Sequence, residues 1–176
     1  SRRKYGLPAE VFSAFRHTYF EGLHAHDFVE LVNNKLKLPL SLTLRQAADG
    51  GLDQWTLDNL MRGELLAVTF ASVKNHRTKH WALCTGCEGN ASGRAILPDT
   101  IHLLDPSASA PSFAYFNARL RLPTSGPGSR RTPPNLLIPS ENSKRKPVHW
   151  LYEAAEWNAE EVRLLAAVRL QLKVAA

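Results

Sequence analysis

Three short apolar runs between residues 63 and 106 constrain the fold more than any other feature of the sequence. They cover residues 63–70, 80–86 and 101–106, and polar connections separate them. The first run is a continuous series of apolar and β-branched residues, which is typical of a strand buried on both faces. The third run ends at Asp105-Pro106, where proline stops a strand because it cannot donate to the sheet ladder. We therefore expect three strands at the centre of the fold.

His80 opens the second run and Asp105 closes the third. If these runs pair side by side, an imidazole and a carboxylate lie near the ends of neighbouring strands. A carboxylate that accepts an imidazole N–H fixes the tautomer of the ring and raises its basicity, which is the supporting half of a nucleophilic triad. His80 and Asp105 are therefore the candidate catalytic residues. Each has a structural alternative: a histidine bonded to backbone groups, and an aspartate that starts a turn.

The two cysteines of the chain, Cys84 and Cys87, are poor candidates for the missing nucleophile. Cys84 follows His80 by four residues on the same predicted strand, which places it about 13 Å away at roughly 3.3 Å per residue, beyond hydrogen-bond reach. No sequence pattern supports Cys87 in that role. A structural zinc site normally takes four ligands, and the chain has no second cysteine pair. We expect structural or incidental cysteines, no metal site and no cofactor.

The first part of the chain has helical patterns. Apolar spacing predicts helices over residues 8–23 and 27–36, the second capped by Asp27, and a further helix over residues 52–61 that Gly63 ends. Between them, residues 38–42 are interpreted as an apolar link, and Thr43 as the cap of a helical turn that stops at residues 50–51.

The last part of the chain is ambiguous between strand and helix. Apolar residues alternate with polar ones from Val162 to Val174, which favours a strand, whereas the Ala, Leu, Glu and Arg content favours a helix. We expect a hairpin formed with residues 148–157. The predicted organisation is a core over residues 1–122, a Pro/Gly/Ser-rich basic linker over 123–147, and a C-terminal hairpin over 148–176 that extends the sheet.

Charge and hydropathy restrict the partners only broadly. The formal net charge is +6 and the pI about 9.6, which permits an acidic partner without identifying one. Basic residues gather in residues 130–146, but they lack the interleaved aromatic residues typical of single-strand binding. No apolar run approaches the roughly 20 residues that cross a bilayer. We expect no transmembrane segment and favour a cytoplasmic location.

The order of these segments resembles the papain-like cysteine peptidases of the double-glycine leader peptidase group. In that family a histidine opens a strand of the His-aromatic-x-x-x-x-Gly kind and the aspartate lies in Asp-Pro. Residues 80–86 (His-Trp-Ala-Leu-Cys-Thr-Gly) and Leu104-Asp105-Pro106 match these two motifs, within a resemblance that covers about residues 5–110. The resemblance implies a papain-like α+β fold, with N-terminal helices packed on a twisted, mainly antiparallel sheet. It also implies a cleft that holds an extended polypeptide.

At the nucleophile position the chain departs from this family. The matching start is Tyr5-Gly6-Leu7-Pro8, with tyrosine where the family has cysteine. This start is similar to that of the degenerate, non-cleaving domains of type I secretion transporters. A phenol, with an ordinary pKa near 10, is a poor substitute for a thiol. The resemblance assigns Tyr5 to the replaced nucleophile position. It places Gly6 and Trp81 beside the peptide, although Trp81, on the strand face opposite His80, is first expected in the core.

Three functions follow from these residues. The first is a non-catalytic module that binds an extended peptide. The second is an active cysteine peptidase whose nucleophile is truncated, mutated or misaligned here. The third is a nucleic-acid-binding or scaffold protein that uses residues 130–146. A likeness to the SUMO-protease type, carried by His80-Trp81, lacks its nucleophile as well, since no cysteine follows Cys87.

Overall fold

The computed structural model of the chain describes Ser13 and residues 23–36, 38–75, 79–92, 95–109, 115–123 and 148–173. Strands dominate this part of the chain. They are β1 (Leu40–Gln46), β2 (Leu65–Ser72), β3 (Lys79–Ser92), β4 (Ala95–Leu104), β5 (Ala118–Arg121), β6 (Trp150–Ala154) and β7 (Trp157–Leu172). The helices are α3 (Ala25–Glu30), which continues as the π-helix η1 (Leu31–Lys35), the 3-10 turn η2 (Ala47–Asp49) and α4 (Leu52–Met61).

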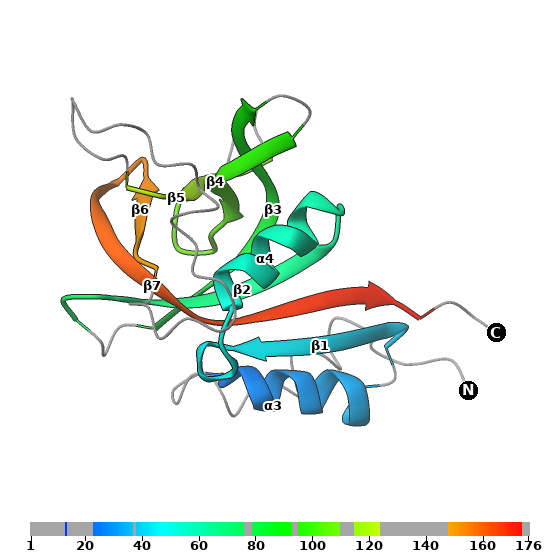
Figure 1. Cartoon of the computed structure of the whole chain (residues 1–176). Coiled ribbons are helices and arrows are strands. Elements are labelled where there is room, and N and C mark those ends of the chain that lie inside the picture. The colour runs from blue at the N-terminus through cyan, green and yellow to red at the C-terminus, as the bar shows by residue number, and fades with distance from the viewer. Residues whose placement is uncertain are drawn as a thin grey trace, which may run out of the picture.

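The strands form one antiparallel sheet that closes on itself. Its order is β1-β7-β2-β3-β4-β5-β6, and β6 pairs in turn with β7, so that strands β2 to β7 make a closed six-stranded barrel. Along β7, residues 157–162 pair with β6, residues 162–170 pair with β2, and residues 166–172 pair with β1. Figure 1 shows β7 as the long, curved orange-to-red strand that leaves the barrel to meet β1.

The expected papain-like α+β fold is therefore wrong. The described residues contain two short α-helices against seven strands, and these helices do not form a layer on an open sheet. The physical cause is the length of β7. Because this strand can pair with β6, β2 and β1 along its 16 residues, it joins the two ends of the sheet into a barrel instead of adding a hairpin at one margin.

The barrel interior and one helix share the main hydrophobic core. Inward residues of all six barrel strands, among them Leu66, Leu103 and Trp150, are fully buried. Helix α4 adds Leu52, Leu57 and Leu60 to the same cluster. Burial of this kind stabilises a fold by about 25 cal/mol per Å² of apolar surface.

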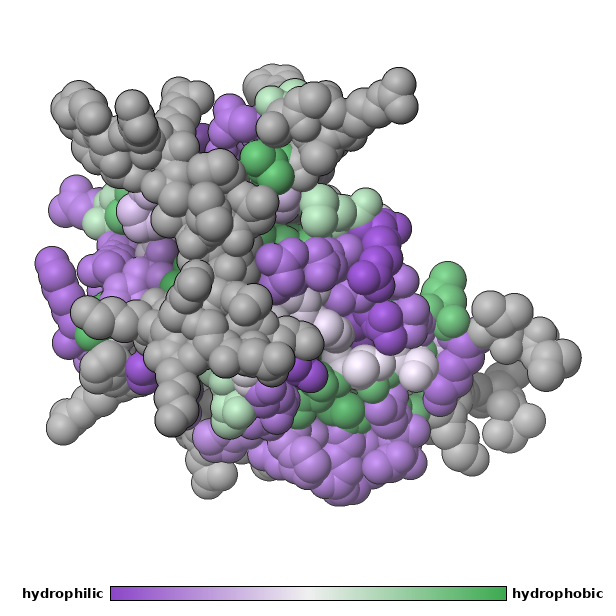
Figure 2. Space-filling model, in the orientation of Figure 1, coloured by the Kyte–Doolittle hydropathy of each residue, from purple (hydrophilic) through white to green (hydrophobic). Residues whose placement is uncertain are grey.

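A second, smaller core lies between α3 and the outer face of the sheet. Val32 from η1 packs against Leu42 of β1 and Val168 of β7, with Phe28 and Trp81 partly buried at its margin. The opposite face of α3 is polar and exposed, with His26, Asp27 and Glu30. It forms the hydrophilic surface at the bottom of Figure 2, where Figure 1 places α3.

Several local predictions are confirmed. The helix over residues 52–61 is α4, and Gly63 ends it with φ of 78°. Backbone hydrogen bonds from Gly63 to Leu60 and from Glu64 to Asn59 complete a Schellman motif. The strand expected at residues 63–70 is β2, which is buried on both faces along most of its length. The C-terminal alternation forms a strand, and it makes the expected hairpin with β6.

Other local predictions need correction. Residues 40–46 are strand β1, not a link followed by a helical turn capped by Thr43, because they pair with Leu172 to Ala166 of β7. Helix α3 begins at Ala25, before Asp27. The helix expected over residues 8–23 and the linker over residues 123–147 fall almost entirely outside the described residues. Among the residues that the structure describes, no helix has the length and apolar character needed to cross a bilayer.

Candidate functional site

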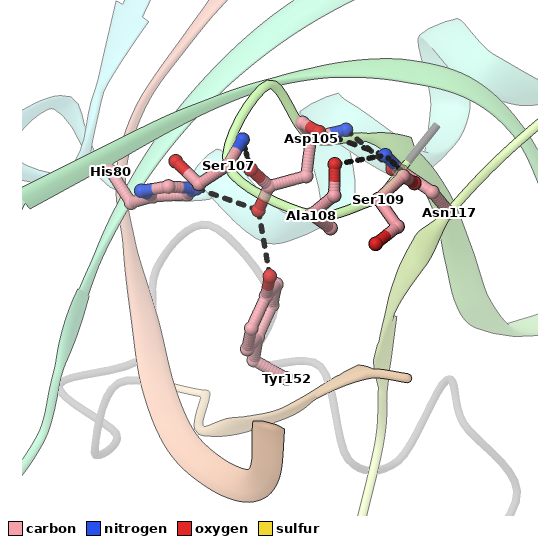
Figure 3. Close-up of polar contacts among 7 residues, drawn as sticks. All are labelled: His80, Asp105, Ser107, Ala108, Ser109, Asn117 and Tyr152. Carbon is pink, nitrogen blue, oxygen red and sulfur yellow. Dashed lines mark hydrogen bonds and ion pairs between the residues drawn. The ribbon is translucent and has the colours of Figure 1, made fainter. Parts of the chain in front are cut away.

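The antiparallel pairing of β3 and β4 brings His80 and Asp105 together. Leu83 pairs with Leu104, so Asp105, the first residue after β4, comes beside the start of β3. His80 Nε2 lies 2.6 Å from Asp105 Oδ2. The His80 side chain is 21% exposed, whereas that of Asp105 is fully buried. The expected pairing of the two runs is confirmed, and with it the contact between imidazole and carboxylate (Figure 3).

Both oxygens of the Asp105 carboxylate are held by donors. Oδ2 accepts from Tyr152 Oη at 2.7 Å as well as from His80, and Oδ1 accepts from the backbone N–H of Ser107 at 2.7 Å. A buried carboxylate is costly unless such donors compensate for lost water. Three donors from three segments therefore fix the position and the orientation of this carboxylate.

Asn117 holds the loop that carries Asp105. Its Oδ1 accepts from the Asp105 backbone N–H at 2.7 Å, and its Nδ2 donates to the Asp105 carbonyl at 2.8 Å. The same Nδ2 lies 3.0 Å from the carbonyl oxygen of Ser109. The amide thus pairs with the backbone as a neighbouring strand would, just beyond the end of β4. Figure 3 shows Asn117 and Tyr152 reaching the loop from different sides.

Tyr152 connects the His80–Asp105 pair to the barrel interior through its hydrogen bond to Asp105. It comes from β6, its residue is 4% exposed, and its ring lies 5.3 Å from that of Phe70 and 6.3 Å from that of His80. Burial raises the pKa of the Tyr152 phenol, and the hydrogen bond to Asp105 and the charge of that carboxylate raise it further. The phenol therefore remains a hydrogen-bond donor at neutral pH. Sequence reasoning missed both Tyr152 and Asn117; the inward position of Tyr152 on an alternating strand was the only available signal.

The His80–Asp105 contact has a defined chemical consequence. When Nε2 donates its hydrogen to the carboxylate, Nδ1 carries the lone pair of the ring and acts as a proton acceptor. This is the arrangement that supports a nucleophile in a triad. Cys84 does not fit that role, because it is 1% exposed, it pairs with Leu66 four residues along the strand from His80, and burial raises its pKa. Burial also raises the pKa of Cys87.

An apolar groove of about 530 Å³ adjoins the pair. It lies along the three adjacent strands β2, β3 and β4 and ends at the loop after β4. Its lining comprises Ala67, Trp81, Ala82, Leu83, Leu104, Asp105, Pro106, Ala108 and Asn117. Asp105 thus belongs both to the groove and to the hydrogen bond with His80.

Trp81 packs at the margin of the second core and also lines the groove. Its indole packs edge-on against Phe28 at 5.7 Å and donates to the Leu23 carbonyl at 2.9 Å, as a core residue would. It also lines the groove. The other residues assigned to the site, Tyr5 and Gly6, lie outside the described residues, as do the basic residues 130–146, so these assignments remain predictions.

Within the described ranges, no group of three His, Cys, Asp or Glu side chains is arranged to hold a metal ion. Comparison of the chain with protein-family models, with curated proteins and with solved structures finds no match in any of the three.

Proposed function

We propose that this protein binds an extended polypeptide in the groove beside His80 and Asp105, without cleaving it. The observation that carries the proposal is that Asp105 both lines the groove and holds the imidazole of His80. The proposal agrees with what the His-Trp and Asp-Pro motifs imply, and it does not depend on the papain-like fold, which the barrel replaces.

The groove has the character expected for an extended chain with apolar side chains. Leu83 and Leu104 pair across β3 and β4, and Leu104 is 38% exposed, so their side chains offer apolar surface along the strands. The one ionisable residue of the lining, Asp105, has its carboxylate buried and saturated. Charged ligands gain little from such a surface, whereas apolar side chains gain by leaving water.

Two matched leucine variants test the proposal. Leu104→Glu places a charge in the groove, and Leu172→Glu makes the same change at a residue that is 75% exposed and does not line it. We expect fluorescein-labelled peptides rich in Leu and Ala to bind the wild type and Leu172→Glu alike. Leu104→Glu should weaken that binding at least tenfold, measured by fluorescence anisotropy. Equal binding by both variants, or no binding by the wild type, would overturn the proposal.

A second candidate function is hydrolysis by a cysteine peptidase whose nucleophile is truncated, mutated or misaligned in this chain. The observation that favours it is the complete set of donors on Asp105, since such fixation suits a carboxylate that orients a catalytic imidazole. The test is to incubate labelled casein with the wild type and with His80→Ala. If the wild type cleaves casein and His80→Ala does not, this candidate is established and the non-cleaving function is rejected. Intact casein in both samples rejects it.

A further inference from the structure

We propose that Tyr152 is a positioning residue that sets how strongly Asp105 holds the His80 proton, because both side chains donate to the same carboxylate oxygen. The proposal goes beyond the proposed function, since His80 does not itself line the groove and its ring lies beside those of Phe70 and Tyr152.

His80 and Tyr152 share one oxygen of the Asp105 carboxylate. Asp105 Oδ2 lies 2.6 Å from His80 Nε2 and 2.7 Å from Tyr152 Oη. Two donors on one oxygen compete for its charge, so each hydrogen bond is weaker than it would be alone. The carboxylate cannot relieve the competition by rotating, since Oδ1 already accepts from the Ser107 N–H at 2.7 Å.

Neighbouring strands and a packed ring hold Tyr152 in place. Its backbone pairs with Leu120 on β5 and with Glu160 on β7, so the residue lies in the middle of three strands. Its ring packs against Phe70 at 5.3 Å. The packed ring therefore holds the hydroxyl oxygen beside Asp105.

The surroundings of Tyr152 keep its phenol protonated. Burial raises its pKa, and the carboxylate of Asp105 and the charge of Glu156 in the following turn add to that effect. The phenol thus keeps its hydrogen at neutral pH, and Tyr152 acts as a constant donor to Asp105.

The test is proton NMR of the hydrogen between His80 Nε2 and Asp105, in the full chain without ligand. Tyr152→Phe removes only the hydroxyl. We expect its Nε2-bound proton to resonate further downfield than in the wild type, because the remaining hydrogen bond receives the full charge of the oxygen. An unchanged resonance, or its loss in a folded protein, would overturn the proposal.

Two controls separate this effect from general disturbance. Tyr115→Phe removes another hydroxyl that contacts a histidine, at 2.9 Å from His102 Nδ1, and should leave the His80 resonance in place. Asp105→Asn should abolish the downfield resonance and thereby assign it. If Tyr152→Phe does not fold, fluorinated tyrosine at position 152 supplies a stronger donor, and the resonance should then move upfield; no movement contradicts the proposal.

The two proposals fail separately. The NMR shift requires no peptide, so a shift in Tyr152→Phe combined with equal peptide binding by Leu104→Glu and Leu172→Glu rejects the binding function alone. Peptide binding lost in Leu104→Glu, together with an unmoved His80 resonance in Tyr152→Phe, rejects the role of Tyr152 alone.

Discussion

Asn33 pairs with the backbone of Leu42 through two hydrogen bonds, each 2.9 Å long, one donated by its Nδ2 and one accepted by its Oδ1. Leu42 belongs to β1, whose strand partner within the described residues is β7. The amide of Asn33 therefore occupies the position of a neighbouring strand on the other side of β1. Natural sheets protect their edges in such ways, since unpaired edge groups invite pairing with other chains.

We expect Asn33→Ala to lower the free energy of unfolding by about 1–3 kcal/mol, because the N–H and C=O of Leu42 lose their partners. Urea denaturation measures the loss, and size-exclusion chromatography should also show more self-association. The control is Asn34→Ala, an exposed neighbour in the same helix. Equal stability of the two variants would show that Asn33 does not protect the edge.

Two glycines on β3 should respond differently to substitution. A Cβ at Gly86 comes no closer than 3.8 Å to its neighbours, whereas one at Gly89 overlaps the carbonyl group of Leu97 on β4. Gly86→Ala should change the free energy of unfolding by less than about 0.5 kcal/mol. Gly89→Ala should cost about 1–3 kcal/mol, as overpacking does. Thermal unfolding of both variants checks this, and a Gly89→Ala protein as stable as Gly86→Ala would contradict the observed β3–β4 register.

Asp53 should make stability depend on pH. Its Oδ1 accepts from Trp150 Nε1 at 2.7 Å, but burial raises its pKa above the ordinary 3.8 in spite of this hydrogen bond. A carboxyl whose folded-state pKa is raised favours folding while protonated. That contribution is present below pH 3.8 and is lost as the pH rises through the folded-state pKa.

We therefore expect Asp53→Asn, which keeps an acceptor without charge, to gain stability relative to the wild type as the pH rises through this window. Denaturant titrations at several pH values measure the difference. Asp53→Ala should be less stable than either, by about 1–3 kcal/mol, since the buried indole N–H loses its acceptor. A difference between wild type and Asp53→Asn that does not change with pH would show that Asp53 does not titrate differently on folding.

The cysteines should react slowly with a thiol reagent in the native protein. Burial raises the pKa of both, and the negative charge of a Cys87 thiolate adds to the effect at Cys84. Only the thiolate reacts quickly. With dithionitrobenzoate we expect no reaction of Cys84 before unfolding and a retarded reaction of Cys87, which Cys87→Ser assigns. Native Cys84 reacting as fast as free cysteine would reopen it as a candidate nucleophile.

The parts of the fold that sequence predicted are local in origin. Helix α4 ends just before Gly63, as the preference of glycine for the position after a helix predicts. The hairpin of β6 and β7 follows from the alternation of apolar and polar residues along the chain. By contrast, the sequence of β1 predicts a link, because the strand pairs with residues of β7 far away in the chain, and seven residues of modest alternation do not indicate a strand. Closure of the barrel depends on one further distant pairing, that of β2 with β7, because its other neighbouring strands are consecutive in the chain. No local pattern predicts that pairing.

The site divides in the same way. The contact between His80 and Asp105 follows from the pairing of consecutive strands, so their motif was enough to predict it. Tyr152 reaches Asp105 across 47 positions of sequence and arrives through β6, whose place in the barrel was unknown. Asn117 bonds to the backbone N–H and C=O of Asp105. Every residue has such groups, so the sequence does not indicate this contact.

Strand β7 also has a consequence for how the protein is made. It pairs with β1, β2 and β6, yet it is translated after all three. Among the described strands, β1 pairs only with β7, and without β7 the strands β2 and β6 each keep a single neighbour, β3 and β5. The nascent chain must therefore keep apolar strands apart from other chains during most of synthesis, and completion of β7 commits the sheet to its final form in one step.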